Sequence, residues 1–187
     1  MSLAFKIHKQ SACYFLTLQI VNWVDIFTRK RYRDILIESL KYCIKEKGLD
    51  VFSYVIMSNH VHLLVCASKH NLSDVIRDFK RHTSRMIIIN MEKENERRRD
   101  WMFSIFKEAA SKHSRNEQYQ LWTHENHAEE IFSPSFTLQK IKYIHNNPVR
   151  AGIVFRDEDY LYSSARDYVG EKGLVPVEVI NLHLLMS

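Results

Sequence analysis

Two β-rich runs separated by a short polar break constrain the fold of this chain more than any other feature. The first run, VFSYVIM, covers residues 51–57, and the second, HVHLLVC, covers residues 60–66. Both runs are rich in β-branched and aromatic residues, and only Ser58 and Asn59 lie between them. This pattern predicts two antiparallel strands joined by a tight turn.

The hairpin is flanked on both sides by further strand and helix patterns. In chain order we expect a strand over 12–21, a helix over 32–47 that Gly48 stops, a helix over 72–89, a short strand over 119–123 and a helix over 134–146 closed by Pro148. The order strand, helix, hairpin, helix, strand, helix predicts an α+β sandwich, with an antiparallel sheet that carries its helices mainly on one face.

The length of 187 residues fits one domain, and the hydrophobic share of 45% is enough for a core. With 4 glycines and 3 prolines, long disordered linkers are not expected. Residues 92–118 are highly charged, and we interpret them as the exposed end of a helix followed by a surface excursion. A tail of undetermined structure begins at about residue 170.

The second strand of the hairpin carries the first candidate site residues. Because strand side chains alternate, His60 and His62 should lie side by side on one face, while Val61, Leu63 and Val65 point into the core. Two adjacent imidazoles can share one metal ion. Taken alone, so short a motif is explained slightly better by two histidines that make ordinary hydrogen bonds.

The helix over 134–146 carries the next candidates. Tyr143 and Asn147 are four residues apart, which makes them neighbours on a helix. Asn147 precedes Pro148, so we expect it at the helix end, where its amide can turn toward a metal. Taken alone, a half-buried tyrosine and a helix-ending Asn-Pro explain these residues better than catalysis does.

The positive charge of the chain suits a polyanionic partner. The formal net charge is +5 and the sequence pI is about 9.1, although many proteins that bind no nucleic acid share such values. The helix over 72–89 places Arg77, Arg81 and Arg85 on the face opposite its apolar one, and together with Lys80 they could follow a phosphate backbone. The alternative is an ordinary solvated charged face.

The expected location is the cytoplasm. The three cysteines form no C-x-x-C pair and are typical of small buried side chains in a reducing compartment. The first ten residues, MSLAFKIHKQ, lack the apolar run of a signal peptide, and no stretch is long enough to span a bilayer, so no membrane partner is expected.

Two of these motifs together resemble a known family. SNHVHLLV is similar to the HUH motif of single-strand DNA transposases, and KYIHNNPVRAGIV is similar to the tyrosine helix of their REP-associated branch. The two occur in the family's order and spacing, and the resemblance covers roughly residues 12–169.

The resemblance implies a ferredoxin-like sandwich and a definite chemistry. Tyr143 would be the nucleophile, and His60, His62 and Asn147 would hold a divalent metal, Mg²⁺ or Mn²⁺. The implied reaction is attack on single-stranded DNA, giving a 5′-phosphotyrosine and a free 3′-hydroxyl, with a hairpin-forming repeat as substrate. The family includes monomers and homodimers. The chain departs from the family at Ser58, where proline is usual.

Two other hypotheses remain open from the sequence. The first is a domesticated protein that binds a DNA hairpin without turnover, which predicts binding but no covalent adduct. The second is a metallohydrolase that uses His60 and His62 with an activated water, which predicts no role for Tyr143. His124 and His127 are a further, weaker candidate metal pair.

Overall fold

The computed structural model describes residues 6–93, 98–112 and 118–181. In chain order the elements are β1 (Tyr14–Gln19), the 3-10 turns η2 (Val21–Trp23) and η3 (Ile26–Thr28), α1 (Lys30–Lys47), β2 (Leu49–Ile56), β3 (His60–Ala67), α2 (Leu72–Lys93), α3 (Arg99–Ser111), β4 (Glu129–Glu130), α4 (Pro134–Arg150), η4 (Asp157–Asp159) and α5 (Ala165–Tyr168).

The four strands form one antiparallel sheet in the order β2-β3-β1-β4. The predicted hairpin is present as β2 and β3, and β1 pairs with β3 from Tyr14 opposite Val65 to Gln19 opposite His60. Two strand-helix-strand halves with this strand order make the ferredoxin-like arrangement, which confirms the expected α+β fold.

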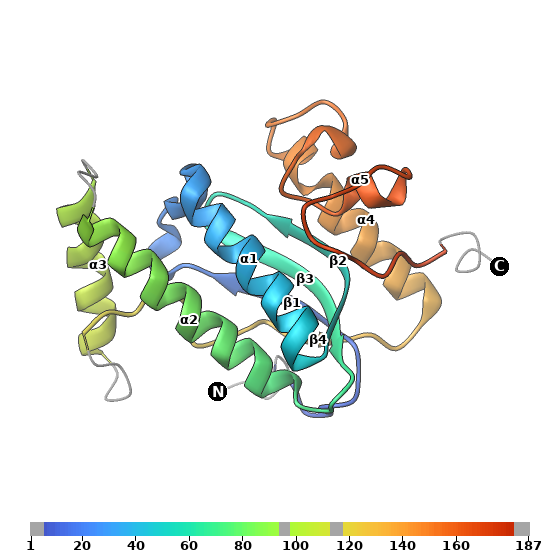
Figure 1. Ribbon diagram of the computed structural model, residues 1–187, viewed down its shortest axis with the longest axis horizontal. Coiled ribbons are helices and arrows are strands. Elements are labelled where there is room, and N and C mark those ends of the chain that lie inside the picture. Colours follow the sequence, from blue (N-terminus) through green and yellow to red (C-terminus); the bar gives the residue numbers. More distant parts are fainter. Residues whose placement is uncertain (1–5, 94–97, 113–117, 182–187) are drawn as a thin grey trace.

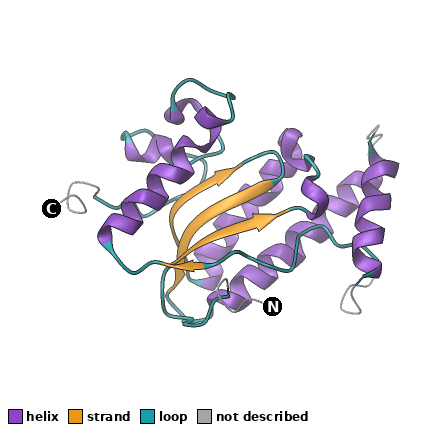
Figure 2. Ribbon diagram, turned by 180° about the vertical axis from the view of Figure 1, so that it is seen from behind, coloured by secondary structure: helices purple, strands orange, loops and turns teal. Residues whose placement is uncertain are grey.

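Helices α1 and α2 lie side by side across one face of the sheet (Figure 1). From behind, both helices are seen beyond the strands (Figure 2). Their inward residues are fully buried, including Leu36 and Leu40 of α1 and Ile76 and Phe79 of α2. Among the described residues, none of the helices combines the length and the apolar character that a membrane crossing requires.

Gly48 ends α1 as the sequence predicts. Its φ of +70° lies in the left-handed region, which glycine adopts at little cost. A Cβ atom at this position would lie 2.6 Å from the Ser68 hydroxyl oxygen. The tight turn from α1 into β2 therefore needs glycine for both conformation and space.

Helix α4 contacts β2 and β3, and it is longer than predicted. It continues through Pro148 to Arg150, so Asn147 is a helical residue and not a helix end. A proline removes one backbone donor and disturbs the bond to the residue four earlier. Here that loss falls near the helix end, where the N–H of Ala151 still donates to the Asn147 carbonyl at 3.0 Å.

The expected charged excursion over residues 92–118 contains a helix that the sequence did not predict. Helix α3 buries Met102 and Phe106 completely. These two residues are four apart, which is helical spacing, but the dense charge around them concealed it. Residues 94–97 and 113–117 of the same segment lie outside the described residues.

The segment after α3 follows β1 without forming the expected strand over 119–123. Only Trp122 makes a bridge there, with Ile20. Further along, the Thr17 N–H donates to the Asn126 carbonyl at 2.9 Å, and β4 pairs with the start of β1. Residues 120–131 therefore lie beside β1 for most of its length.

Candidate active site

The start of β3 brings the two predicted histidines together. The ring centroids of His60 and His62 are 4.7 Å apart. Helix α4 places Tyr143 on the same site, with its ring centroid 5.2 Å from that of His62. His62 is buried, whereas the Tyr143 side chain is 38% exposed, so an external substrate can reach the phenol.

A polar network fixes the orientation of His60. The Asn59 side-chain nitrogen donates to Asp25 Oδ1 at 3.0 Å and to the Trp23 carbonyl at 3.3 Å. These bonds turn the Asn59 amide oxygen toward His60 Nδ1, 2.8 Å away. Because that oxygen can only accept, Nδ1 of His60 carries the proton, and Nε2 keeps its lone pair.

His62 is held by the neighbouring strand. Its Nδ1 lies 2.9 Å from the Thr17 hydroxyl, and its ring stacks on Phe15 with centroids 5.3 Å apart. The hydroxyl can accept the Nδ1 proton, which leaves Nε2 of His62 with a lone pair as well. Partners of this kind set the tautomer of histidines that bind metals.

Both imidazoles are neutral at neutral pH. Burial lowers the pKa of His60 below its ordinary value of 6.5. Burial, with smaller effects from His60 and Lys140, lowers the pKa of His62 to about 3. Since only the neutral ring can bind a metal, the pair suits a divalent ion in both tautomer and charge.

Among the predicted site residues, Asn147 has the weakest connection to the other side chains of the site. It lies one turn beyond Tyr143 on α4 and is half-buried. In the described part of the chain, no hydrogen bond joins its amide to His60, His62 or Tyr143. Nor do the described residues contain a group of three or more His, Cys, Asp or Glu side chains that could hold a metal. An ion at the histidines would therefore need an amide oxygen, water or substrate oxygens as well.

The histidine pair His124 and His127 lies in a loop, so the helical spacing on which that alternative rested is not realised. His127 itself has a φ of +39°.

The predicted DNA-contact residues gather in a groove of about 900 Å³ between α2 and residues 118–126. The four predicted contacts, Arg77, Lys80, Arg81 and Arg85, all line it. Arg77 and Arg81 are exposed and form ion pairs with Asp74 and Asp78. Pairs this exposed are weak, so both arginines can turn to a phosphate.

Lys80 differs from the arginines. Its Nζ donates to the Thr123 carbonyl at 2.7 Å and to the Asn126 side-chain oxygen at 2.8 Å. Burial lowers its pKa to about 8, so the ammonium form persists at neutral pH. Lys80 therefore ties α2 to the far wall of the groove. The sequence gave no sign of these bonds.

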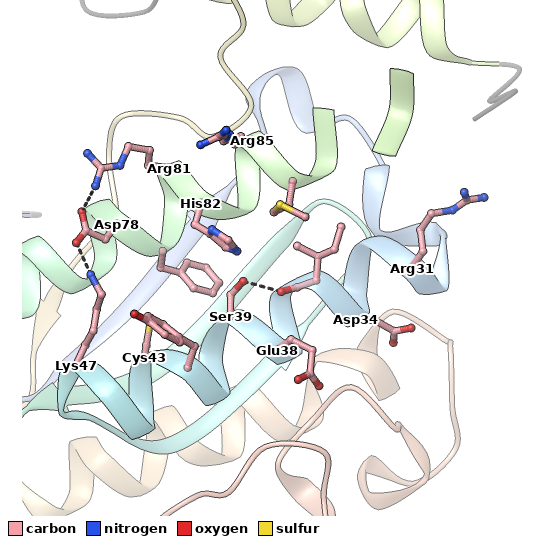
Figure 3. A pocket seen from close by; sticks show the side chains of 14 residues that line it. Arg31, Asp34, Glu38, Ser39, Cys43, Lys47, Asp78, Arg81, His82 and Arg85 are labelled. Atoms are coloured by element: carbon pink, nitrogen blue, oxygen red, sulfur yellow. Dashed lines mark hydrogen bonds and ion pairs between the residues drawn. The ribbon is translucent and has the colours of Figure 1, made fainter. Parts of the chain in front are cut away.

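A second cavity of about 830 Å³ lies between α1 and α2 (Figure 3), and neither His60 nor His62 lines it. Its rim carries charges of both signs, and Asp78 there bridges Lys47 and Arg81. The lining of this cavity adds the carboxylates of Asp34, Glu38 and Asp78, so it suits a polyanion less well than the groove beside residues 118–126, whose described lining has Glu92 as its acidic residue.

The sequence did not single out Thr17, Asp25 or Trp23, each of which touches the site or its supporting network. Trp23 is 59% exposed, and its ring meets His60 edge to face at 6.2 Å. It and Asn22 have φ values of 56° and 52°, in the left-handed region, which asparagine adopts readily but which is strained for tryptophan. Of these residues, only Trp23 could have been suspected as a site residue from the sequence. The left-handed backbone conformation that positions it leaves no mark in the sequence.

The chain matches a known protein family in sequence and a solved DNA-bound protein in fold. The sequence model of the family described as "Transposase IS200 like" matches residues 11–147. No curated protein sequence matches the chain. Among solved structures, the chain is similar to a REP-associated tyrosine transposase bound to a REP hairpin, with a TM-score of 0.63 and 14% identity over 95% of this chain and 92% of that one. At this identity the likeness shows the fold.

Proposed function

Because the chain belongs to the IS200-like transposase family, we propose that it cuts and rejoins single-stranded DNA through a covalent bond to Tyr143. The observation that carries this proposal is the contact between Tyr143 and His62, which puts an accessible phenol beside two neutral, oriented imidazoles. A metallohydrolase with an activated water would have no use for that phenol.

The proposed reaction is a transesterification. The Tyr143 oxygen attacks the phosphorus of a DNA phosphodiester, the new O–P bond forms, and the bond from phosphorus to the 3′ oxygen breaks. The phenol proton ends, in net terms, on the departing 3′-hydroxyl. The same 3′-hydroxyl, or one on another strand, can reverse the reaction.

We propose that His60, His62 and Asn147 hold a divalent ion, Mg²⁺ or Mn²⁺. When bound there it would polarise the phosphate and stabilise the charge that develops on it. The chain's own residues prepare this site: Asn59 and Thr17 orient the imidazoles, and burial keeps both rings neutral.

Attack within one chain is favoured over attack across a homodimer. Tyr143 lies against His62 of its own chain and meets Phe15 edge to face at 5.9 Å. No exchange of α4 between two copies is needed to bring the phenol to the histidines.

We propose hairpin-forming DNA as the substrate, with the backbone of the hairpin in the groove that Arg77, Arg81 and Arg85 line. The structurally similar transposase is bound to a REP hairpin, and the groove carries several cations on one side. Its far wall, residues 118–126, also borders β1, so the groove and the histidine site share one segment of chain.

We further propose that residues 1–187 form one structural unit. Residues 170–181, which the sequence led us to expect as part of a tail, pack back on the sheet. Val175 is 1% exposed, and the Glu178 N–H donates to the Val51 carbonyl at 2.9 Å.

The first test is a gel assay with labelled single-stranded hairpin oligonucleotides from the flanks of the gene and Mn²⁺. The parent protein should give a slowly migrating, protease-sensitive labelled adduct, because the phenol becomes esterified to DNA. Tyr143→Phe should give none. Tyr42→Phe, which changes an exposed tyrosine of α1, is the matched control and should behave as the parent.

Nicking by Tyr143→Phe at the parental rate would refute the proposal. Tight binding of several hairpins without any adduct would instead favour a domesticated DNA-binding protein.

A further inference from the structure

A row of aromatic rings crosses the site from one exposed end. Trp23 meets His60 at 6.2 Å, His60 meets His62 at 4.7 Å, and His62 stacks on Phe15 at 5.3 Å, measured between ring centroids. Tyr143 lies beside this row, in contact with both His62 and Phe15. The candidate nucleophile therefore lies between the two ends of the row.

The row continues beyond Phe15 to a second exposed end. Lys140 Nζ lies 4.2 Å from the Phe15 ring centroid and 5.0 Å from that of Phe136. Phe136 in turn stacks on Phe132, with centroids 4.7 Å apart and planes at 19°. The residues come from η2, β3, β1, α4 and the loop before α4, so their alignment is a product of the fold.

Both ends of the row have an aromatic side chain that is largely exposed to solvent. Trp23 is 59% exposed and Phe132 is 77% exposed. Single exposed apolar residues are ordinary, but these two stand on either side of one candidate nucleophile. Trp23 is also held in a left-handed conformation, its N–H bonded to the Ile20 carbonyl at 3.1 Å. Strain of this kind persists where the surrounding structure enforces it, and it concentrates at functional sites.

The cation within the row is held in place. The Lys140 ammonium is bonded to Glu129 at 2.8 Å, and its side chain is only 15% exposed. It therefore lies between two aromatic rings at a fixed position. A strand that crosses this row would meet exposed rings at its two ends, Trp23 and Phe132, with the Lys140–Glu129 ion pair lying between Phe15 and Phe136.

We infer that this row is the path of the single-stranded part of the substrate, with one nucleobase stacked on Trp23 and another on the Phe132–Phe136 pair. Every base has an aromatic face, so such stacking holds a strand with little regard to its sequence. The two stacked bases would lie on opposite sides of the phosphate that faces Tyr143. This inference rests on the proposed function, because it assumes that the phosphate to be cut lies at Tyr143, and it adds the two sites where the neighbouring bases bind.

The test measures binding separately from turnover, in the full chain carrying Tyr143→Phe. Affinity for a hairpin oligonucleotide with single-stranded flanks is compared with and without Trp23→Ala. Stacking of one base is worth about 1–3 kcal/mol, so we expect binding to weaken by about 5- to 150-fold. Phe132→Ala should have an effect of similar size. Tyr42→Ala is the matched control, because Tyr42 is 57% exposed on α1, and it should change nothing.

The decisive step replaces flank nucleotides one at a time by abasic sites. One position should weaken binding to the parent but cause no further loss in Trp23→Ala, and a different position should do the same for Phe132→Ala. If the loss of binding free energy caused by an abasic site adds to the loss caused by the protein substitution at every position, the inference is wrong. Trp23→Phe keeps a ring and should retain most of the affinity, which guards against a loss caused by misfolding.

This outcome is separable from the fate of the proposed chemistry. If the parent forms an adduct while Trp23→Ala binds and cuts equally well, the inference fails and the chemistry stands. If no adduct forms but the abasic positions couple to Trp23 and Phe132, the chemistry fails and the binding path stands.

Discussion

At the scale of single residues, the sequence predicted which side chains come together but not how they are oriented. His60, His62 and Tyr143 lie together as expected, because strand alternation and the motif order are visible in the sequence. The support given by Asp25 and Thr17 was not predictable, since it depends on contacts between segments far apart in the chain. Such contacts follow from the fold and not from local pattern.

The orientation of His60 yields a prediction for metal affinity. Asn59→Ala removes the acceptor that holds the proton on Nδ1, so Mn²⁺ should bind about 10- to 100-fold more weakly, as is typical when such a partner is removed. Isothermal titration calorimetry measures this directly. Asn90→Ala, on α2, is the control, and an unchanged affinity in Asn59→Ala would argue against the tautomer assigned here.

The three cysteines differ more than the sequence suggested. Cys43 is buried, but Cys13 and Cys66 are only partly buried and lie at the paired strands β1 and β3. A hydrogen bond with Cys66 lowers the pKa of Cys13 to about 7, although burial and Asp50 oppose the shift. Burial raises the pKa of Cys43 to about 11.

Cys13 should therefore be the first thiol to react with iodoacetamide. Its thiolate predominates above pH 7, whereas Cys43 stays protonated, so its labelling rate should rise through a midpoint near pH 7. Mass spectrometry of the labelled peptides identifies the site, and Cys13→Ser should remove the fast phase. Equal labelling of Cys43 would contradict this assignment.

At the scale of elements, the position of α4 depends on a buried polar junction. His145 Nε2 lies 3.0 Å from the Ser53 hydroxyl on β2 and 2.9 Å from the Ser164 hydroxyl near the C-terminus. Ser164 also accepts the Tyr54 N–H at 2.9 Å. Three segments that are far apart in the sequence therefore meet at His145, which lies two positions after Tyr143 on α4.

Loss of the junction should destabilise the fold and misplace the phenol. His145→Ala leaves two buried hydroxyls without this partner, so the free energy of unfolding should fall by about 1–3 kcal/mol in a urea titration. The yield of DNA adduct should fall with it. Asn146→Ala, at the exposed next position, is the control, and a parental yield from His145→Ala would show that α4 is held by other contacts.

Element types were predictable where apolar spacing was strong, as in α1, α2 and the hairpin. The misses have physical causes. Pro148 was taken to end α4, but a proline near a helix terminus disturbs few bonds and its ring is buried here. Helix α3 was missed because Met102 and Phe106 are embedded in charge, and what buries them is tertiary structure.

At the scale of the whole molecule, the cationic side chains of the groove fall into two groups. Arg81 and Arg85 are exposed in the groove, whereas Lys80 is committed to Thr123 and Asn126. Arg81→Gln with Arg85→Gln should flatten the dependence of log affinity on log salt by about 0.7–0.9 for each DNA phosphate that is no longer neutralised. Filter binding at several salt concentrations measures this slope.

Lys41→Gln with Lys45→Gln on α1 is the charge-matched control and should leave the slope unchanged. If the arginine variant and the parent protein have the same salt slope, the DNA backbone does not bind in this groove. Lys80→Met should lower stability more than it changes the slope, because it removes two bonds across the groove.

The contacts of residues 160–168 have a consequence for the order in which the protein is made. The Ile56 N–H donates to the Tyr162 carbonyl, and Ser164 completes the junction at His145, so α4 is secured by chain that lies beyond it. Domains fold as synthesis proceeds, from the N-terminal end. A nascent chain that has already presented its histidines and its tyrosine still lacks the part that fixes one against the other. The phenol is therefore fixed against the histidines only after residues 160–168 have been synthesised and have packed on β2 and His145.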